Sequence, residues 1–213
     1  MDFLTIHKLL PREPNLLLSL LDLSEMGKKH IGFYYIKKLD NNQHLILPSA
    51  GEVIHVVKGC LLQQMSSAEQ KTVVTAIWRE SDFIFRNVFQ DDDYEYVALG
   101  RVELVIYDAN VVLQEISKQP FFADLLIDIL KKQEQQFFLY SNMLTKSSEE
   151  RVTDILKRLS ERGPEGYYIP KIINYKLLAK CCQVTPRTAK MKLEKLEKSN
   201  EIIRVKKEKI LLY

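Results

Sequence analysis

Short apolar segments separated by turn residues fill the chain from residue 32 to residue 116. They are GFYYIKKL, HLILP, VIHVVKG, CLLQQM, TVVTAIW, DFIF, EYVAL and VELVIYD. Strands of this length, about ten residues apart, are typical of an antiparallel sandwich or barrel. The pattern therefore predicts a single β-roll in this region.

A helical period follows from Pro120 to Lys146. One side of this predicted helix carries Phe122, Leu125, Ile129, Gln133 or Gln136, Phe137, Tyr140 and Leu144. About 26 residues at about 1.5 Å each give a rod of roughly 39 Å, which is long for one small domain. We expect the stripe to pack against the same helix of a second subunit, while the β-roll of its own subunit covers some residues, particularly Phe121 and Leu126.

The long helix is interrupted where Ser147 and Glu150 match a capping box, a pattern in which each side chain satisfies an amide of the other residue. We expect a hinge at this point. A new helix is predicted from Glu149 to about Arg162, because apolar residues again recur at helical steps.

Two further helices separated by only a few residues come next. The first runs from Tyr175 to Cys182 after a cap at Asn174, and the second begins at Pro186 with Thr185 as its N-cap. Helices joined so closely must cross sharply. This arrangement is a helix-turn-helix, whose second helix can lie in the major groove of DNA.

The second helix packs along one stripe, formed by Ala189, Leu193 and Leu196. Asn200 can adopt the left-handed conformation that ends a helix. The segments Ile202–Val205 and Ile210–Tyr213 flank four residues that include three lysines. They predict a β-hairpin with a basic tip, which is the wing of a winged helix.

The charge of the chain is divided unevenly. Residues 151–213 contain 16 Lys and Arg against 7 Asp and Glu, a net charge of +9, whereas residues 1–150 have a net charge of −6. A single Lys-rich helix is usually just a solvated surface. Helix, turn, basic helix and basic hairpin together favour a polyanion, double-stranded DNA, as the partner.

Three cysteines, Cys60 and the adjacent pair Cys181 and Cys182, give neither a disulfide framework nor the CxxC spacing of a metal site. We therefore expect a reducing cytoplasm, no bound metal and no cofactor. Neighbouring helical residues point about 100° apart, so a disulfide within the pair would be strained. We expect Cys182 in the core and Cys181 partly exposed, and a thiol switch stays open as an alternative.

Other functional classes find little support in the sequence. The chain lacks a Gly-rich phosphate loop, HExxH and GxSxG, so we predict that it is not an enzyme. Residues 15–23, NLLLSLLDL, are too short to span a bilayer and lack the features of a signal peptide, which predicts a small packing helix and no membrane partner. The acidic run at residues 91–93 is interpreted as a solvated loop rather than a calcium site.

Taken together, these elements predict an α+β protein of three parts. Residues 1–117 form a sensor or effector β-roll, residues 118–146 a long dimerisation helix, and residues 147–213 a winged helix-turn-helix.

This order of elements resembles the Crp/Fnr family of bacterial transcription regulators. HVVKG at residues 55–59 is similar to the family's YIVKG, and SDFIF at residues 81–85 is similar to its GDFIG. The segment LLAKCCQVTPRTAKMKLEKLEKSNEII, residues 177–203, keeps the family's turn spacing. The resemblance covers nearly the whole chain. It implies a β-roll of the cyclic-nucleotide-binding or cupin-like jelly-roll type and a homodimer that binds a palindromic promoter site and recruits or blocks RNA polymerase.

The chain also departs from the family pattern. Members that bind cyclic nucleotides carry Gly-Glu after GDFIG and Arg-Ser further on, where this chain has residues 85–87, Phe-Arg-Asn, and residues 94–95, Tyr-Glu. Glu95 would repel a phosphate, so we predict that cyclic AMP does not bind. A single cysteine before residue 181 argues against an iron-sulfur cluster within one chain. The four scattered histidines are interpreted as ordinary residues, although counting them does not exclude haem.

The predicted recognition helix differs from the family's as well, so we expect a different operator sequence. Arg187 and Lys190 are predicted to face base edges, because Arg can hydrogen-bond guanine in bidentate fashion. Contacts to phosphates are expected from Tyr175, Lys176, Thr185, Lys206, Lys207 and Lys209. Thr188 and Met191 complete the predicted DNA-binding set.

The sequence therefore predicts a sequence-specific, DNA-binding transcription regulator, either activator or repressor. It contains no recognisable effector-binding motif. The alternative is an effector-binding β-roll protein without operator-specific DNA binding. The identity of an effector, which could be a peptide, a metabolite or none, stays open.

Overall fold

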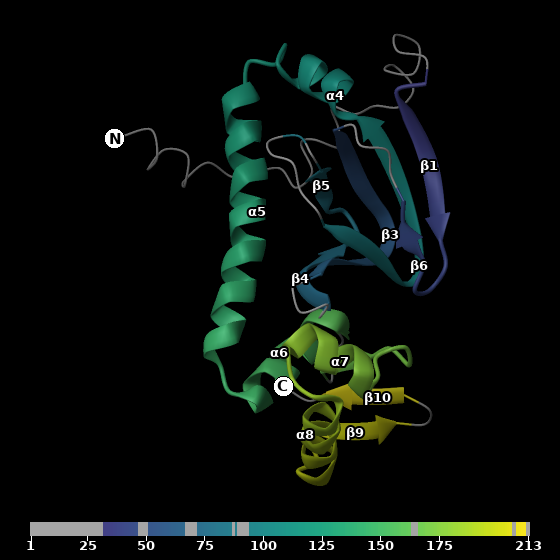
Figure 1. Ribbon diagram of the computed structural model, residues 1–213, viewed down its shortest axis with the longest axis vertical. Coiled ribbons are helices and arrows are strands. Elements are labelled where there is room, and N and C mark those ends of the chain that lie inside the picture. The colour runs from purple at the N-terminus through teal and green to yellow at the C-terminus, as the bar shows by residue number, and fades with distance from the viewer. Residues whose placement is uncertain are drawn as a thin grey trace.

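The computed structural model describes residues 32–46, 51–66, 72–86, 88, 94–162, 166–205 and 208–211. An antiparallel sheet forms one end of the molecule, a long helix stands beside it, and the C-terminal helices with a small sheet form the other end (Figure 1). The predicted helix at residues 15–23 and the acidic run at residues 91–93 lie outside the described residues. No helix in the described ranges is long and apolar enough to cross a membrane.

The N-terminal sheet has six antiparallel strands. They are β1 (Tyr34–Leu39), β2 (His44–Leu45), β3 (Glu52–Ser66), β4 (Thr72–Arg79), β5 (Phe83–Arg86) and β6 (Glu95–Asp108). The strand order is β1-β6-β3-β4, with β2 paired to β6 and β5 paired to β3. This arrangement confirms the predicted antiparallel β-sheet domain.

Two long strands replace four of the predicted short ones. VIHVVKG and CLLQQM belong to β3, and EYVAL and VELVIYD belong to β6. Both strands bend at a glycine with positive φ, 92° at Gly59 and 82° at Gly100. A Cβ atom at Gly59 would lie 2.4 Å from the carbonyl oxygen of Arg101, so the close approach of β3 and β6 requires glycine there. The prediction of separate strands was wrong because these glycines bend the ladder without ending it.

Five helices are described. They are α4 (Ala109–Ile116), α5 (Phe122–Thr145), α6 (Ser148–Leu159), α7 (Tyr175–Cys182) and α8 (Pro186–Lys198). The sequence pattern did not predict α4, whose N-cap Asp108 accepts a hydrogen bond from the amide of Asn110 at 2.8 Å. The long helix α5 has 24 residues, about 36 Å, and begins after Pro120 rather than at it.

The C-terminal region, α6 to β10, includes a small sheet. Its strands are β7 (Glu161–Arg162), β8 (Tyr167–Ile169), β9 (Ile202–Val205) and β10 (Glu208–Leu211), in the order β7-β8-β10-β9. The hairpin β9–β10 matches the predicted wing. The strands β7 and β8 extend it to four strands. The helix predicted to reach about Arg162 ends at Leu159, because Glu161 and Arg162 pair with β8 instead.

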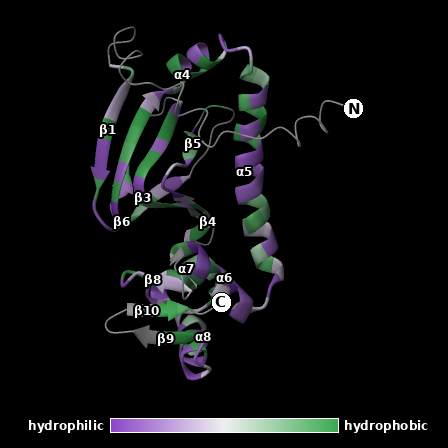
Figure 2. Cartoon of the chain, turned by 180° about the vertical axis from the view of Figure 1, so that it is seen from behind, coloured by the Kyte–Doolittle hydropathy of each residue, from purple (hydrophilic) through white to green (hydrophobic). Residues whose placement is uncertain are grey.

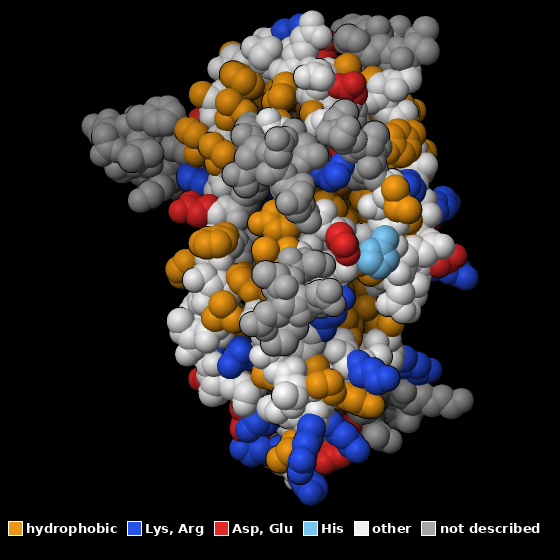
Figure 3. Space-filling view, in the orientation of Figure 1, with side chains coloured by type: hydrophobic (Ala, Val, Ile, Leu, Met, Phe, Trp, Pro, Cys, Tyr) orange, Lys and Arg blue, Asp and Glu red, His pale blue; other side chains and the backbone are white. Residues whose placement is uncertain are grey.

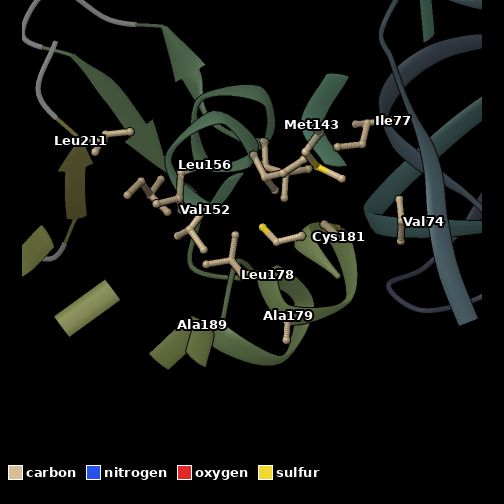
Figure 4. Close-up of a cluster of buried hydrophobic side chains, with 14 of the residues drawn as sticks. Val74, Ile77, Met143, Val152, Leu156, Leu178, Ala179, Cys181, Ala189 and Leu211 are labelled. Carbon is tan, nitrogen blue, oxygen red and sulfur yellow. The ribbon is translucent and has the colours of Figure 1, made fainter. Parts of the chain in front are cut away.

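The hydrophobic core does not stop at the boundary between the sheet and the C-terminal region. Figure 2 shows hydrophobic residues on the N-terminal strands, on α4 and on α6 to α8. In one cluster Val74 and Ile77 of β4 join Met143 of α5, Ile155 of α6 and Cys181 of α7 (Figure 4). The C-terminal region therefore docks on the sheet through buried apolar side chains.

Candidate nucleic-acid interface and effector cavity

The helix-turn-helix is built from strong local signals. Asn174 Oδ1 accepts a hydrogen bond from the amide of Lys176 at 3.0 Å, and Thr185 Oγ1 accepts one from the amide of Thr188 at 3.1 Å. Gln183 links the two helices with a left-handed φ of 51°. The capping residues predicted for α7 and α8 are therefore confirmed, and they fix where each helix begins.

The exposed side of α8 carries most of the predicted DNA-binding residues. Ala189 and Leu196 are buried beneath the helix, as its apolar stripe predicted. Six residues of the predicted DNA-binding set are exposed, and Thr188 is half-buried. The exposed residues are Tyr175, Lys176, Thr185, Arg187, Lys190 and Met191. Lys206 and Lys207 lie outside the described residues, and Lys209 is described only as backbone of β10. Lys and Arg side chains gather over this end of the molecule (Figure 3).

Two lysines of α8 pair with a carboxylate of α6. Lys195 Nζ lies 2.8 Å from both carboxylate oxygens of Glu149 on α6, and Lys192 Nζ lies 3.2 Å from one of them. Hydrogen bonds from Lys195 and then Lys192 hold the pKa of Glu149 below its ordinary value. These two lysines therefore fix α8 to α6 and leave the N-terminal half of α8, with Arg187 and Lys190, as the open basic face.

The predicted hinge between α5 and α6 is bridged by side chains. The capping box is present, because Glu150 Oε2 accepts from the amide of Ser147 at 2.9 Å and Ser147 Oγ accepts from the amide of Glu150 at 3.3 Å. Arg151 donates from Nε to the carbonyl oxygen of Lys146 and from Nη1 to that of Cys182, both at 3.1 Å. One guanidinium therefore joins the C-terminal ends of α5 and α7.

The predicted dimerisation stripe is divided by the structure between two directions. Leu125 and Ile129 are buried against the sheet and α4 of the same subunit, where Phe121 and Phe122 also pack. Phe137 is 72% exposed and Leu144 is 43% exposed. Gln133, Gln136 and Tyr140 are half-buried. Leu125 and Ile129 therefore belong to the subunit's own core, while Phe137 and Leu144 are open to solvent.

One exposed residue of α5 was missing from that stripe. Leu130 is 50% exposed and stands seven residues before Phe137, which stands seven before Leu144. A period of seven is the repeat of a left-handed coiled coil. A search for this heptad, rather than for helical steps in general, would have found Leu130.

A cavity of about 500 Å³ lies between the sheet and α5. Its walls are mostly apolar or aromatic, and Glu134 is the only charged residue among those described. The lining residues are Gln63, Met65, Thr75, Trp78, Ile84, Phe85, Tyr94, Tyr96, Leu130, Gln133, Glu134, Phe137 and Tyr140. Gln63 Oε1 accepts from Trp78 Nε1 at 2.9 Å, so the amide and the indole are held in the wall by each other.

Glu95 does not line this cavity, contrary to the reason given for expecting no cyclic AMP. Its carboxylate accepts from Gln64 Nε2 at 3.2 Å and lies 3.5 Å from His44 Nδ1, with half of its side chain exposed. Side chains alternate between two faces where β6 begins, and the neighbours of Glu95 that line the cavity are Tyr96 of β6 and Tyr94 just before it. What a phosphate would meet there is a wall without a described cation.

Solved structures with this arrangement are known. A cyclic nucleotide-binding domain containing protein from Listeria monocytogenes is 17% identical, with a TM-score of 0.72 over 92% of this chain and 95% of that chain. FixK2 from Bradyrhizobium japonicum is 12% identical, with a TM-score of 0.70 over 84% and 92%. A CRP-family transcriptional regulator from Thermus thermophilus is 12% identical, with a TM-score of 0.66 over 83% and 92%. This chain has the Crp/Fnr fold. No family model matches the chain, and no curated protein matches its sequence.

Within the Crp/Fnr fold of this chain, one side chain touches both the cavity and the helix-turn-helix. Tyr140 of α5 lines the cavity, and its hydroxyl accepts a hydrogen bond from Nε2 of Gln183, the residue that joins α7 to α8. Burial raises the pKa of the Tyr140 hydroxyl above its ordinary value, against the opposing effect of the bond from Gln183. The cavity wall is therefore connected to the turn by a single residue.

The cysteines of this Crp/Fnr fold are free, and they are packed rather than poised for reaction. Cys181 is 1% exposed, so the expectation that it is partly exposed was wrong, because α7 turns it toward β4 and α5. Burial raises the pKa of the Cys60 and Cys182 thiols to about 12. The reactive thiolate is therefore scarce at both sites. The described residues contain no group of three or more His, Cys, Asp or Glu that could hold a metal ion.

Proposed function

We propose that this protein is a sequence-specific DNA-binding transcription regulator that acts as a homodimer on a palindromic promoter site. The observation that carries the proposal is the capped helix-turn-helix, whose second helix leaves Arg187, Lys190 and Met191 exposed at its N-terminal half. A recognition helix contacts base edges with these first turns. The net charge of +9 on residues 151–213 supplies the attraction to phosphates.

The exposed heptad of α5 supports the homodimer. Leu130, Phe137 and Leu144 would form the seam of a two-stranded coiled coil, and the neighbouring Gln133 and Tyr140 complete its a and d spacing. A two-fold dimer presents two copies of α8 to half-sites about 34 Å apart, which requires an inverted repeat in the DNA. Such a protein is expected to act in a bacterial cytoplasm and to recruit or block RNA polymerase.

The DNA contacts divide into two kinds. Arg187 and Lys190 would read base edges, where a bidentate arginine contributes about 1–3 kcal/mol of discrimination. Tyr175, Lys176 and Thr185 would contact phosphates near the first turns of α7 and α8, where helix N-termini favour anions. Lys206, Lys207 and Lys209 of the hairpin would do the same.

The test is selection of bound sequences from random DNA with the purified full-length protein, followed by gel shifts at several salt concentrations. We expect an inverted repeat, and a log affinity that falls linearly with log salt. Arg187→Ala should relax the base preference, whereas Lys207→Ala should weaken all sequences alike and reduce the salt slope by about one unit. Failure to retard any duplex at low salt would contradict the proposal and favour an effector-binding protein that does not bind an operator.

The cavity beside α5 is proposed as the site of an effector other than cyclic AMP. A cyclic nucleotide brings a phosphate, and burying that charge needs a fixed cation. The described wall offers only the carboxylate of Glu134, which would repel it. Six aromatic side chains among those lining the cavity, Trp78, Phe85, Tyr94, Tyr96, Phe137 and Tyr140, suit a neutral ligand with a large apolar surface.

A further inference from the structure

A second cavity lies at the junction between the N-terminal sheet and the C-terminal region. Its volume is about 410 Å³, within the range of small-molecule sites. The sheet contributes the bends of β3 and β6 and the end of β4, and the C-terminal region contributes the end of α6 and the segment after β8. We call this space the junction cleft. It is separate from the cavity beside α5, because no residue lines both.

The junction cleft is basic. Among the described lining residues, Lys58, Arg79 and Arg101 stand against one carboxylate, that of Glu80, a net charge of +2. Arg101 lies 3.9 Å from Asp40, but both side chains are more than three-quarters exposed, so water screens this pair. Two further carboxylates lie outside the lining and keep their negative charge: Asp82, whose Oδ2 accepts from the amide of Arg79 at 2.7 Å, and Glu103, which lies 3.1 Å from Lys38.

One buried polar group of the cleft is unsatisfied among the described residues. Ser160 lines it and is 2% exposed, and in the described part of the chain no group hydrogen-bonds to its hydroxyl. Arg79 donates from Nη2 to the carbonyl oxygen of Ser160 at 3.4 Å, which brings its charge to the C-terminal region. There it meets Arg158, whose pKa is lowered by burial and next by the charge of Arg79. Asp154 partly offsets this repulsion, and an anion bound in the cleft beside Arg79 would reduce it further.

We propose that the junction cleft binds a phosphorylated small molecule, whose phosphate is held by Lys58, Arg79 and Arg101. A phosphate offers three acceptor oxygens to these donors, and the arginines can hold it in bidentate fashion. The cleft has room for more than the phosphate alone, so the rest of the molecule would contact Leu99, Pro170 and Ile172. Because the two walls belong to different parts of the chain, the ligand strengthens the docking of the C-terminal region on the sheet.

The experiment uses the full-length protein without DNA, so its outcome is independent of the proposed DNA-binding function. Inorganic pyrophosphate is titrated by calorimetry at constant ionic strength, and the thermal midpoint is followed in parallel, since a ligand of the folded state raises it. We compare the wild type with Lys58→Gln/Arg101→Gln, whose changed side chains are exposed. The matched control is Lys118→Gln/Lys132→Gln, which removes the same charge from exposed positions on the segment before α5 and on α5 itself.

We expect one pyrophosphate per subunit and an affinity about tenfold lower in the Lys58/Arg101 variant, with the control variant equal to the wild type. Circular dichroism should report the same fold for all three proteins. The proposal is overturned if no saturable binding occurs. It is also overturned if both double variants bind as the wild type does, because the anion then binds elsewhere, for example at the open basic face of α8.

Discussion

Replacing Phe137 by alanine should dissociate the proposed homodimer while leaving the subunit folded. The side chain is 72% exposed in the subunit, and a phenylalanine presents about 150–250 Å² of surface, so about 110–180 Å² is available to a partner. At about 25 cal/mol per Å², full burial contributes about 3–4 kcal/mol per copy. If the partner covers only half of this area, the two copies together still contribute about 3 kcal/mol. The dissociation constant of the dimer should then rise by a factor of about 100 or more.

Phe138→Ala provides the matched control. Phe138 is the next residue of α5 and is 62% exposed, but it lies about 100° around the helix and outside the Leu130, Phe137, Leu144 heptad. Sedimentation equilibrium over a range of concentrations measures both variants against the wild type. We expect weaker association for Phe137→Ala and near-wild-type association for Phe138→Ala. Equal dissociation constants for the two variants would refute the assignment of the seam.

Three more predictions follow from the contacts described. Arg151→Met removes two charge-assisted hydrogen bonds to helix-end carbonyls, so chemical denaturation should show a loss of about 3 kcal/mol, with the exposed Arg101→Met as a control close to zero. The pKa of Glu149 is depressed in the folded protein, so its contribution to folding stability is complete above the unfolded pKa of about 4.3 and is lost as pH falls through the lower folded pKa. In thermal melts at falling pH, Glu149→Gln should therefore lack this part of the acid sensitivity. Cyclic AMP should give no saturable heat in calorimetry with the wild type, and micromolar affinity would show that the cavity holds a phosphate after all.

The parts of the fold that depend on local interactions could be predicted from the sequence. Thr185 and Pro186 begin α8, Ser147 and Glu150 begin α6, and Asn200 ends α8 with a φ of 61°, because each signal acts within a few residues. The order of these elements was enough to indicate the Crp/Fnr fold.

The parts that depend on distant residues could not be predicted. The bend at Gly59 exists because the backbone of Arg101, far along the chain, approaches it, and a single strand pattern carries no sign of this contact. The apolar positions of α5 are wide enough to cover two faces, so helical steps alone could not separate Leu125 and Ile129, which face the sheet, from Phe137 and Leu144, which do not. The junction cleft draws its walls from four separate strands and helices, and its basic residues are scattered in the sequence.

The position of Tyr140 has a thermodynamic consequence. A molecule that fills the cavity beside α5 contacts this ring. A rearrangement of the turn between α7 and α8 changes the hydrogen bond between the ring's hydroxyl and Gln183. The two events therefore share one interaction. If occupancy of the cavity changes the affinity for DNA by a given factor, binding of the operator must change the affinity for the cavity's ligand by the same factor. A regulator bound to its promoter would then respond to its ligand at a different concentration from one that is free.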